Sequence, residues 1–114
     1  MSIVYTDNIT VLSAVGSTTT SSAYDISKRQ QVTLEFIATG TTTFTVDVSN
    51  DGTNWITSVA FLDAKATAVG TYVTSKVVTV AANEGAIITP GFRFIRVVAA
   101  TNGGTATAIL QTAG

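Results

Sequence analysis

The sequence predicts an all-β protein, folded as a single antiparallel β-sandwich of jelly-roll-like type with roughly eight or nine strands. Apolar and polar residues alternate with a period of two through almost the whole chain, and β-branched residues dominate. Turn residues recur between the alternating runs at a spacing of roughly 8 to 12 residues, which is typical of sandwiches. The 114 residues suit one core, so we expect one domain over residues 1–114. Within it, residues 1–8 form an N-terminal arm or an edge strand.

Three alternating runs fill the first half of the chain, at residues 9–15, 31–39 and 43–49. Asp51-Gly52 follows the third run. Between two alternating runs this pair is a strong hairpin signal, because glycine accepts the positive φ that such a turn needs. We therefore predict that the chain reverses there and that residues 55–62 form the next strand, covered on both sides for part of its length.

The second half continues with runs at residues 71–82, 86–89, 92–100 and 105–112. We expect the first of these to be one long strand, and the last to pair back on the third after a glycine turn. Arg93 and Arg96 are three apart, so in a strand they point to opposite faces and cannot form one basic patch. The five phenylalanines lie in alternating runs and are interpreted as core residues: Phe36, Phe44, Phe61, Phe92 and Phe94.

Charge is scarce in this chain. Charged residues make up 11% of it, against roughly 25% in an ordinary domain. The net charge of −1 offers nothing that attracts a polyanion, so we expect no nucleic-acid partner. The uncharged stretches are too rich in hydroxyls and glycine to span a membrane, and no signal peptide is apparent. Because a nearly neutral, apolar domain tends to self-associate, we infer that part of its surface is normally covered.

The residues needed for most enzyme chemistry are missing. The chain has no cysteine and no histidine, which excludes disulfides, thiolate metal sites and the commonest general base. No acidic residue is flanked by a pattern that would raise its pKa while a neighbouring acidic residue stays ionised, as a glycosidase needs. No S-x-x-K motif is present to activate a serine. We therefore expect a protein that is not an enzyme, with no catalytic residues, no cofactor and no bound metal.

The stretch "TVDVSNDGTNW", residues 45–55, invites two site interpretations. Its acidic residues match the first half of a calcium loop, but Ser58 occupies the position where a bidentate glutamate is needed. A plain turn, whose side chains bond their own backbone, is the favoured interpretation. The alternative calcium ligands are Asp47, Asn50, Asp51 and Asn54.

Trp55, the only tryptophan, leaves the same turn. We favour placing its side chain in the core, since an aromatic residue buries about 150 to 250 Å² and a strand of this size needs such an anchor. If the indole is exposed instead, it can stack on a sugar ring. That alternative defines a glycan-binding site made of Asn50, Asp51, Asn54, Trp55 and Tyr72.

Three segments carry a family resemblance: "FTVDVSNDGTNW" (44–55), "FRFIRVVAA" (92–100) and "TATAIL" (105–110). Together they resemble a pattern met in small virion proteins of tailed bacteriophages, such as capsid decoration and other minor structural proteins. The first two segments are also similar to strands of discoidin-like carbohydrate-binding modules, including the S-x-D-G-x-x-W turn. Unlike those modules, this chain lacks cysteines and is unusually poor in charge.

The virion resemblance implies a non-enzymatic structural protein that is made in the host cytoplasm and decorates or cements the capsid surface. Its implied partners are a viral capsid protein and further copies of itself, with a trimer favoured. We expect Ile3, Val4 and Tyr5 to contact such a partner as an arm or edge strand, or else to be an ordinary first strand. A glycan-binding module and a tail or baseplate component remain the alternatives.

Overall fold

The computed structural model describes residues 5–65, 68, 70–79 and 83–114, and these contain strands but no helix. The all-β prediction is confirmed. Eleven strands lie within the described residues, three more than a minimal jelly roll needs. They are β1 (Tyr5–Val15), β2 (Thr19–Thr20), β3 (Tyr24–Asp25), β4 (Gln31–Ala38), β5 (Thr41–Ser49), β6 (Phe61–Asp63), β7 (Tyr72–Val73), β8 (Lys76–Val78), β9 (Asn83–Ile88), β10 (Phe94–Asn102) and β11 (Ala106–Ala113).

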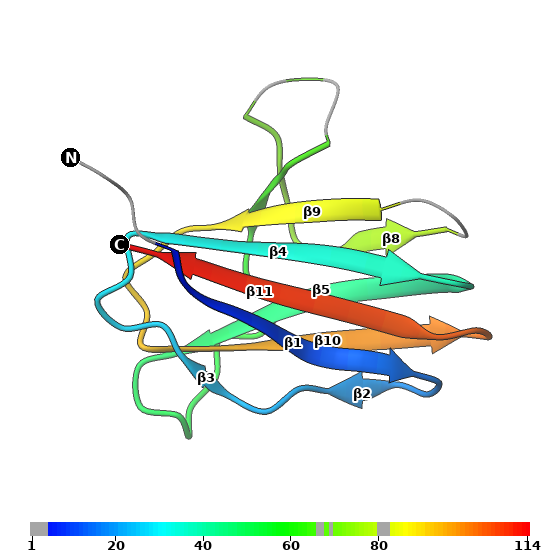
Figure 1. Ribbon diagram of the computed structural model, residues 1–114, viewed down its shortest axis with the longest axis horizontal. Helices are drawn as coiled ribbons and strands as arrows, with labels where there is room; N and C mark the ends of the chain where they lie inside the picture. The colour runs from blue at the N-terminus through cyan, green and yellow to red at the C-terminus, as the bar shows by residue number, and fades with distance from the viewer. Residues whose placement is uncertain (1–4, 66–67, 69, 80–82) are drawn as a thin grey trace.

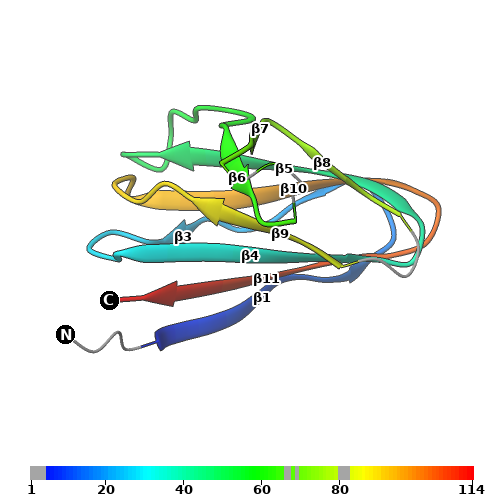
Figure 2. The same ribbon diagram turned by 90° about the horizontal axis from the view of Figure 1, so that it is seen from above.

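The strands form two antiparallel sheets stacked as layers (Figures 1 and 2). One sheet has the order β1-β11-β4-β9-β6-β7. The other has the order β2-β10-β5-β8, with β3 also paired to β10. If β2 and β3 count as one interrupted strand and the β6–β7 hairpin as an insertion, eight strands remain. Renumbered from 1 to 8 along the chain, these strands have the order 1-8-3-6 in one sheet and 2-7-4-5 in the other, which is the jelly-roll arrangement. The predicted sandwich is confirmed in that form.

Alternation along the long strands builds the core between the sheets. In β4 every second residue is buried, from Val32 to Ala38, and the inward residues of β5 and β10 in the facing sheet are buried as well. Phe36 of β4 stacks on Phe44 of β5 with ring centroids 4.5 Å apart, and Phe61 meets Phe36 edge-on at 6.1 Å. These three rings join both sheets, and truncation of such a buried ring typically costs 3–5 kcal/mol.

The other two phenylalanines behave differently. Phe92 is half-buried and packs against the core from the segment before β10. Phe94 lies on the outer face of the β10–β5 sheet, because Ile95, Val97 and Ala99 take the inward positions of β10. The core prediction is therefore wrong for Phe94. Its ring lies beneath the guanidinium of Arg93, 4.9 Å from the centroid.

Three strand predictions are wrong. Residues 55–62 do not form a strand next to β5: after the turn only Val48 and Ile56 pair, in an isolated bridge, and β6 starts at Phe61 in the other sheet. The run 71–82 is not one strand either, since β7 belongs to one sheet and β8 to the other. Residues 80–82 lie outside the described part. The last run does not pair back on the run before it, since β11 lies between β1 and β4 and β10 lies in the other sheet. In all three places the chain changes sheets, and local alternation does not encode that crossing.

At one end of the sandwich, two turns touch through their backbones. The β4–β5 turn contains Gly40 and the β10–β11 turn contains Gly104; a Cβ on Gly40 would lie 2.0 Å from the carbonyl oxygen of Gly103. The backbone N–H of Thr39 donates to the Thr105 carbonyl at 3.0 Å, and the Thr105 N–H donates to Thr39 Oγ1 at 2.8 Å. Both turns cross between the sheets, so this contact fixes the sheets to each other.

Beside β8, the last strand of its sheet, a salt bridge joins the two layers. Lys76 of β8 lies 2.7 Å from Asp63 Oδ2 on β6 and 3.5 Å from Glu84 Oε1 on β9. The hydrogen bond from Lys76 lowers the pKa of Asp63, and the same bond raises the pKa of Lys76. The side chains are half-buried or nearly buried, so the pair ties β8 to the facing sheet.

Candidate functional site

The turn after β5 is closed by its own side chains. Ser49 Oγ accepts a hydrogen bond from the Gly52 N–H at 2.9 Å and donates to the Asn54 carbonyl at 2.6 Å. Asp51 Oδ1 accepts from the N–H groups of Thr53 and Asn54 at 2.9 and 2.8 Å, and Asn54 Nδ2 donates to Asp51 Oδ2 at 2.8 Å. Gly52 has φ +78°, as the turn prediction requires.

These bonds determine the charge state of the turn. The backbone hydrogen bond from Asn54, followed by those from Thr53 and the Asn54 side chain, holds the pKa of Asp51 far below its ordinary value. Asp51 is exposed yet engaged through both carboxylate oxygens. The favoured interpretation of the stretch, a turn whose side chains bond its own backbone, agrees with this geometry.

Beside the turn, three side chains from different segments stack on the outer face of the β10–β5 sheet. Asp47 of β5 is 3% exposed; its Oδ2 accepts from Arg96 Nε on β10 at 2.8 Å, and its Oδ1 accepts from the Ser58 N–H at 3.0 Å. The Arg96 guanidinium lies 4.1 Å from the centroid of the Trp55 ring. The indole, the guanidinium and the carboxylate therefore form one layered cluster, which fixes the 55–59 segment on the sheet.

Trp55 is not in the core, contrary to prediction. The bridge between Val48 and Ile56 places the neighbouring Trp55 on the same face as Asp47, outside the sandwich, where it is half-buried against Arg96. The three phenylalanines of the core fill the volume between the sheets instead. Arg96 is the residue that sequence reasoning missed: its register opposite Asp47 depends on the pairing of β10 with β5, which are separated by 49 residues in the chain.

The structure groups only some of the proposed site residues. Asn50, Asp51, Asn54 and Trp55 lie in or directly after one turn, whereas Tyr72 lies on β7. In Figure 1 this turn projects below β3, and the β6–β7 hairpin projects from the top of the view. The set proposed for glycan binding is thus divided between two regions. The alternative calcium ligands Asp47 and Asp51 each direct their carboxylates to other partners, namely Arg96 and the turn backbone.

In the part of the chain that the structure describes, no group of three acidic side chains comes close enough to hold a metal ion. Those residues also contain no helix long and apolar enough to cross a bilayer.

The predicted interface residues lie at the first strand. Tyr5 begins β1 and pairs with Ala113 of β11, whereas Ile3 and Val4 lie outside the described residues. β1 is at one end of the strand order of its sheet: β11 pairs with one side of it, and no described strand pairs with the other. Its register shifts between Tyr5 and Asp7 and twice more after Thr10, and such bulges limit continuous pairing along an edge.

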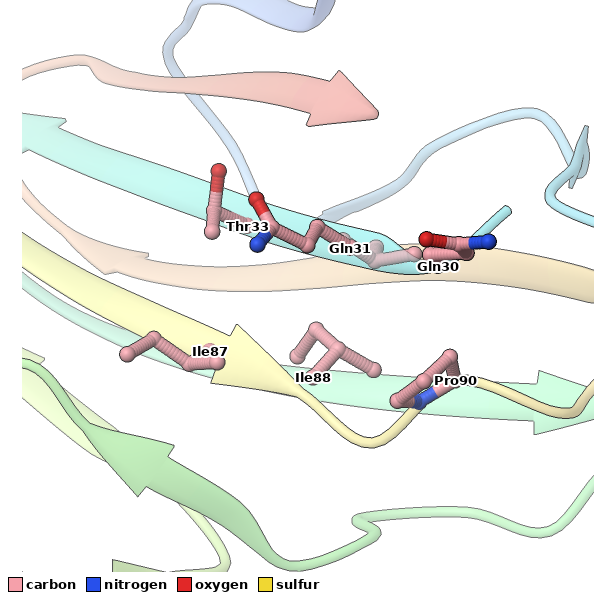
Figure 3. A pocket seen from close by; sticks show the side chains of 7 residues that line it. Gln30, Gln31, Thr33, Ile87, Ile88 and Pro90 are labelled. Atoms are coloured by element: carbon pink, nitrogen blue, oxygen red, sulfur yellow. The ribbon is translucent and has the colours of Figure 1, made fainter. Parts of the chain in front are cut away.

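A groove lies in the same sheet, at the point where the pairing of β4 with β9 ends (Figure 3). Its volume is about 250 Å³. One wall comes from the start of β4 and the other from the end of β9 and the segment beyond it. The lining residues are Gln30, Gln31, Val32, Thr33, Ile87, Ile88 and Pro90. Sequence reasoning did not identify this groove, because it depends on the pairing of β4 with β9, two strands far apart in the chain.

No family model matches the chain, and no curated protein matches it. Among solved structures, the crystal structure of the SPBc2 prophage-derived protein YomS has the same fold. The superposition has a TM-score of 0.84 and covers 100% of this chain and 96% of that chain, with 10% sequence identity. The likeness thus extends over the entire jelly roll, and at this identity it establishes the fold that the two chains share.

Proposed function

We propose that the chain is a non-enzymatic structural protein of a tailed-bacteriophage particle. The observation that carries this proposal is the full-length likeness in fold to a prophage-derived protein. It is supported independently by the sequence resemblance to small virion proteins. Within the particle, we favour a homo-oligomer that decorates or cements the capsid surface, with a tail or baseplate position as the alternative.

The surface supports a role in adhesion. Among the residues that the structure describes, four large apolar side chains are exposed, and they lie on both sheets and on the 55–60 loop: Ile56, Tyr72, Val77 and Ile87. Their burial against neighbouring subunits gains about 25 cal/mol per Å² before association costs. Repetition over a lattice then multiplies weak contacts. Such a protein works by area and shape, which agrees with the scarcity of charge.

The N-terminal segment offers one contact in this scheme. No described strand pairs with the outer edge of β1, so a short partner strand can pair with its regular stretch from Asp7 to Thr10, and we expect Ile3 and Val4 to contact the same partner. Deletion of residues 1–4 leaves all the described pairs of β1 with β11 intact. If the arm contacts the capsid, this deletion weakens capsid binding while the thermal unfolding midpoint stays unchanged. Equal capsid binding by the deletion variant and the full chain would remove the arm from the proposal.

Binding to purified particle components tests the main proposal. The full chain is mixed with phage capsids and, separately, with purified tails, and co-sedimentation and native mass are measured. Saturable binding to capsids at a fixed number of copies supports decoration, whereas saturable binding to tails alone moves the protein to the tail or baseplate. Absence of binding to either component overturns the proposal.

Glycan binding remains a second candidate because Trp55 lies at the surface rather than in the core. Against it, one ring face contacts Arg96 and the Asp51 carboxylate is already satisfied within the turn. Acrylamide quenching of the single tryptophan, with and without a panel of sugars, decides this point. A sugar that shields Trp55 from the quencher supports a glycan site, whereas unchanged quenching with every sugar rejects it.

A further inference from the structure

β1 is held less regularly than the other long strands. It lies at the end of its sheet, outermost at the bottom of Figure 2, and three register shifts interrupt its pairing with β11. Among its described side chains Leu12 alone is buried, while Val11 and Val15 pack partly against the core. Release of β1 therefore removes one buried side chain from the described core, fewer than release of β4, β5, β10 or β11.

The strand that β1 covers is regular. β11 pairs with β4 through eight consecutive residues without a shift, and its inward residues Ala106, Ala108 and Leu110 are buried. If β1 leaves, the backbone groups along this edge of β11 lose their partners, and an unpaired regular edge is a template for another strand. The strand with a demonstrated fit is β1 itself. A second copy supplies the same β1, with the same pairs to β11, so no new complementarity is needed.

Backbone strain lies at the end of β1. Between the pairs Leu12–Ala108 and Val15–Ala106, β1 contains one residue more than β11, which is a β-bulge. Ala14 in this bulge has φ +49°, a left-handed conformation that is costly for a residue with a Cβ. Its N–H donates to Thr107 Oγ1 at 3.1 Å instead of to a backbone carbonyl. The ladder between β1 and β11 is thus already interrupted beside the point where the chain leaves the sheet.

A short connection follows the strained residue. Residues 16–18 carry the chain from β1 in one sheet to β2 in the other. This connection is lightly held: Thr19 Oγ1 donates to the Ser17 carbonyl at 2.7 Å, and a Cβ on Gly16 would have Gly104 as its nearest neighbour, 4.0 Å away. If the connection straightens, Ala14 can return to ordinary extended backbone. Strain that the closed chain stores and an open chain releases favours strand exchange.

We propose that β1 is exchanged between copies of this chain. β1 of one copy leaves its own β11 and pairs with β11 of a second copy in the same register, with residues 16–18 as the hinge. The exchange closes as a reciprocal pair, or as a ring such as the expected trimer. This inference rests on the self-association included in the proposed function, and it names the segment that joins the copies.

Introduced cysteines test the exchange directly, because the chain has none of its own. Asn8 of β1 is paired with Gln111 of β11. The full-length variants Asn8→Cys and Gln111→Cys are unfolded together in urea, refolded at about 300 μM under reducing conditions, and then oxidised with copper–phenanthroline. A disulfide between the two variants forms in register only where β1 of one chain lies on β11 of another. We expect a native mass above that of the monomer and a covalent product on a non-reducing gel.

Each variant refolded and oxidised alone is the matched control for links formed by random collision. The neighbouring pair, Thr10→Cys with Ile109→Cys, repeats the test so that a poorly oriented first pair cannot hide the link. A chain that stays monomeric overturns the inference. So does an oligomer in which neither mixture forms more covalent product than its separate variants, because each β1 then remains on its own β11.

Hinge variants sharpen the test. Ala14→Gly relieves the strain of the closed chain, so it should raise the dissociation constant of the oligomer roughly 10-fold or more. Ser13→Gly is the control, since it adds a glycine to the same bulge at a residue without positive φ. Equal shifts in the two variants would contradict the role of strain. Neither experiment contains a capsid component, so the exchange can fail while capsid binding holds, and the reverse.

Discussion

Strand β5 is held in opposite ways at its two ends. Before it, the Gly40 turn lies so close to Gly103 and Gly104 that no side chain fits between the two backbones. After it, the chain is held by side chains: Ser49 and Asp51 close the turn, and Asp47 holds the following segment through Ser58 and Arg96. One end therefore depends on side chains being absent, and the other on particular polar side chains being present.

This difference indicates where the molecule tolerates change. The glycine end fixes the relation of the two sheets, so substitutions there act on the whole fold. The polar end fixes a loop on the outside of one sheet, so substitutions there act mainly on that surface. The four variants below separate these effects, and all are measured by urea unfolding with circular dichroism.

The largest effect is expected for Gly104→Ala. Gly104 has φ +79°, and its added Cβ would lie 2.6 Å from the backbone nitrogen of Gly40. Left-handed strain of about 1–2 kcal/mol and overpacking against backbone together predict a loss of roughly 3–4 kcal/mol. Gly103→Ala is the matched control: its φ is +81°, but no described atom beyond its chain neighbours lies within 4 Å of the Cβ. Equal losses in the two variants would show that strain alone, and not the turn contact, matters.

Next in size is Asp47→Ala. It removes the carboxylate that Arg96 and the Ser58 N–H share, and leaves a half-buried guanidinium without this partner. We expect a loss of about 2–3 kcal/mol, less than for a fully buried pair because Arg96 remains partly hydrated. A double-mutant cycle with Arg96→Met isolates the pair. If Asp47→Ala costs as much in the Arg96→Met background as in the wild type, the two side chains are not coupled.

Trp55→Leu should have a smaller effect. The substitution keeps an apolar group but removes the ring over the Arg96 guanidinium, and a cation–π contact at a partly exposed site contributes about 0.5–1 kcal/mol. Trp55→Phe keeps an aromatic face and should lose less. A loss of about 3 kcal/mol or more for Trp55→Leu would instead indicate a core residue.

The smallest effect is expected for Asp51→Asn, and it depends on pH. Because the pKa of Asp51 is lowered in the folded protein, its ionised form contributes stability that is fully present above the unfolded pKa of about 3.9. This contribution is lost as the pH falls below that value toward the folded pKa. The urea midpoints of wild type and Asp51→Asn should therefore differ at pH 7 and converge below about pH 4. A difference that stays constant from pH 7 to pH 3 would contradict the assignment.

Much of the fold could be predicted from the sequence, and the errors share one cause. The long strands β4, β5, β10 and β11 follow from alternation alone, because half of each strand faces one core. Asp51-Gly52 correctly predicts a turn, in which the side chains of Ser49 and Asp51 accept hydrogen bonds from backbone N–H groups. It does not predict that the chain then crosses to the other sheet at β6. The core prediction for Trp55 is wrong because it depends on side-chain size alone, whereas the pairing of Val48 with Ile56 places Trp55 on the face of Asp47.

The sequence by itself determined that this chain is all-β, that its core is aliphatic and phenylalanine-rich, and that its surface has little charge. These properties depend on local alternation and composition, which each segment carries independently of its partners. Only the tertiary structure decided that Arg96 lies between Asp47 and Trp55, that Gly40 and Gly104 touch, and that a groove opens where the pairing of β4 with β9 ends. Each of these depends on the register between strands far apart in the chain, and register is set by the packing of the whole sandwich rather than by any one segment.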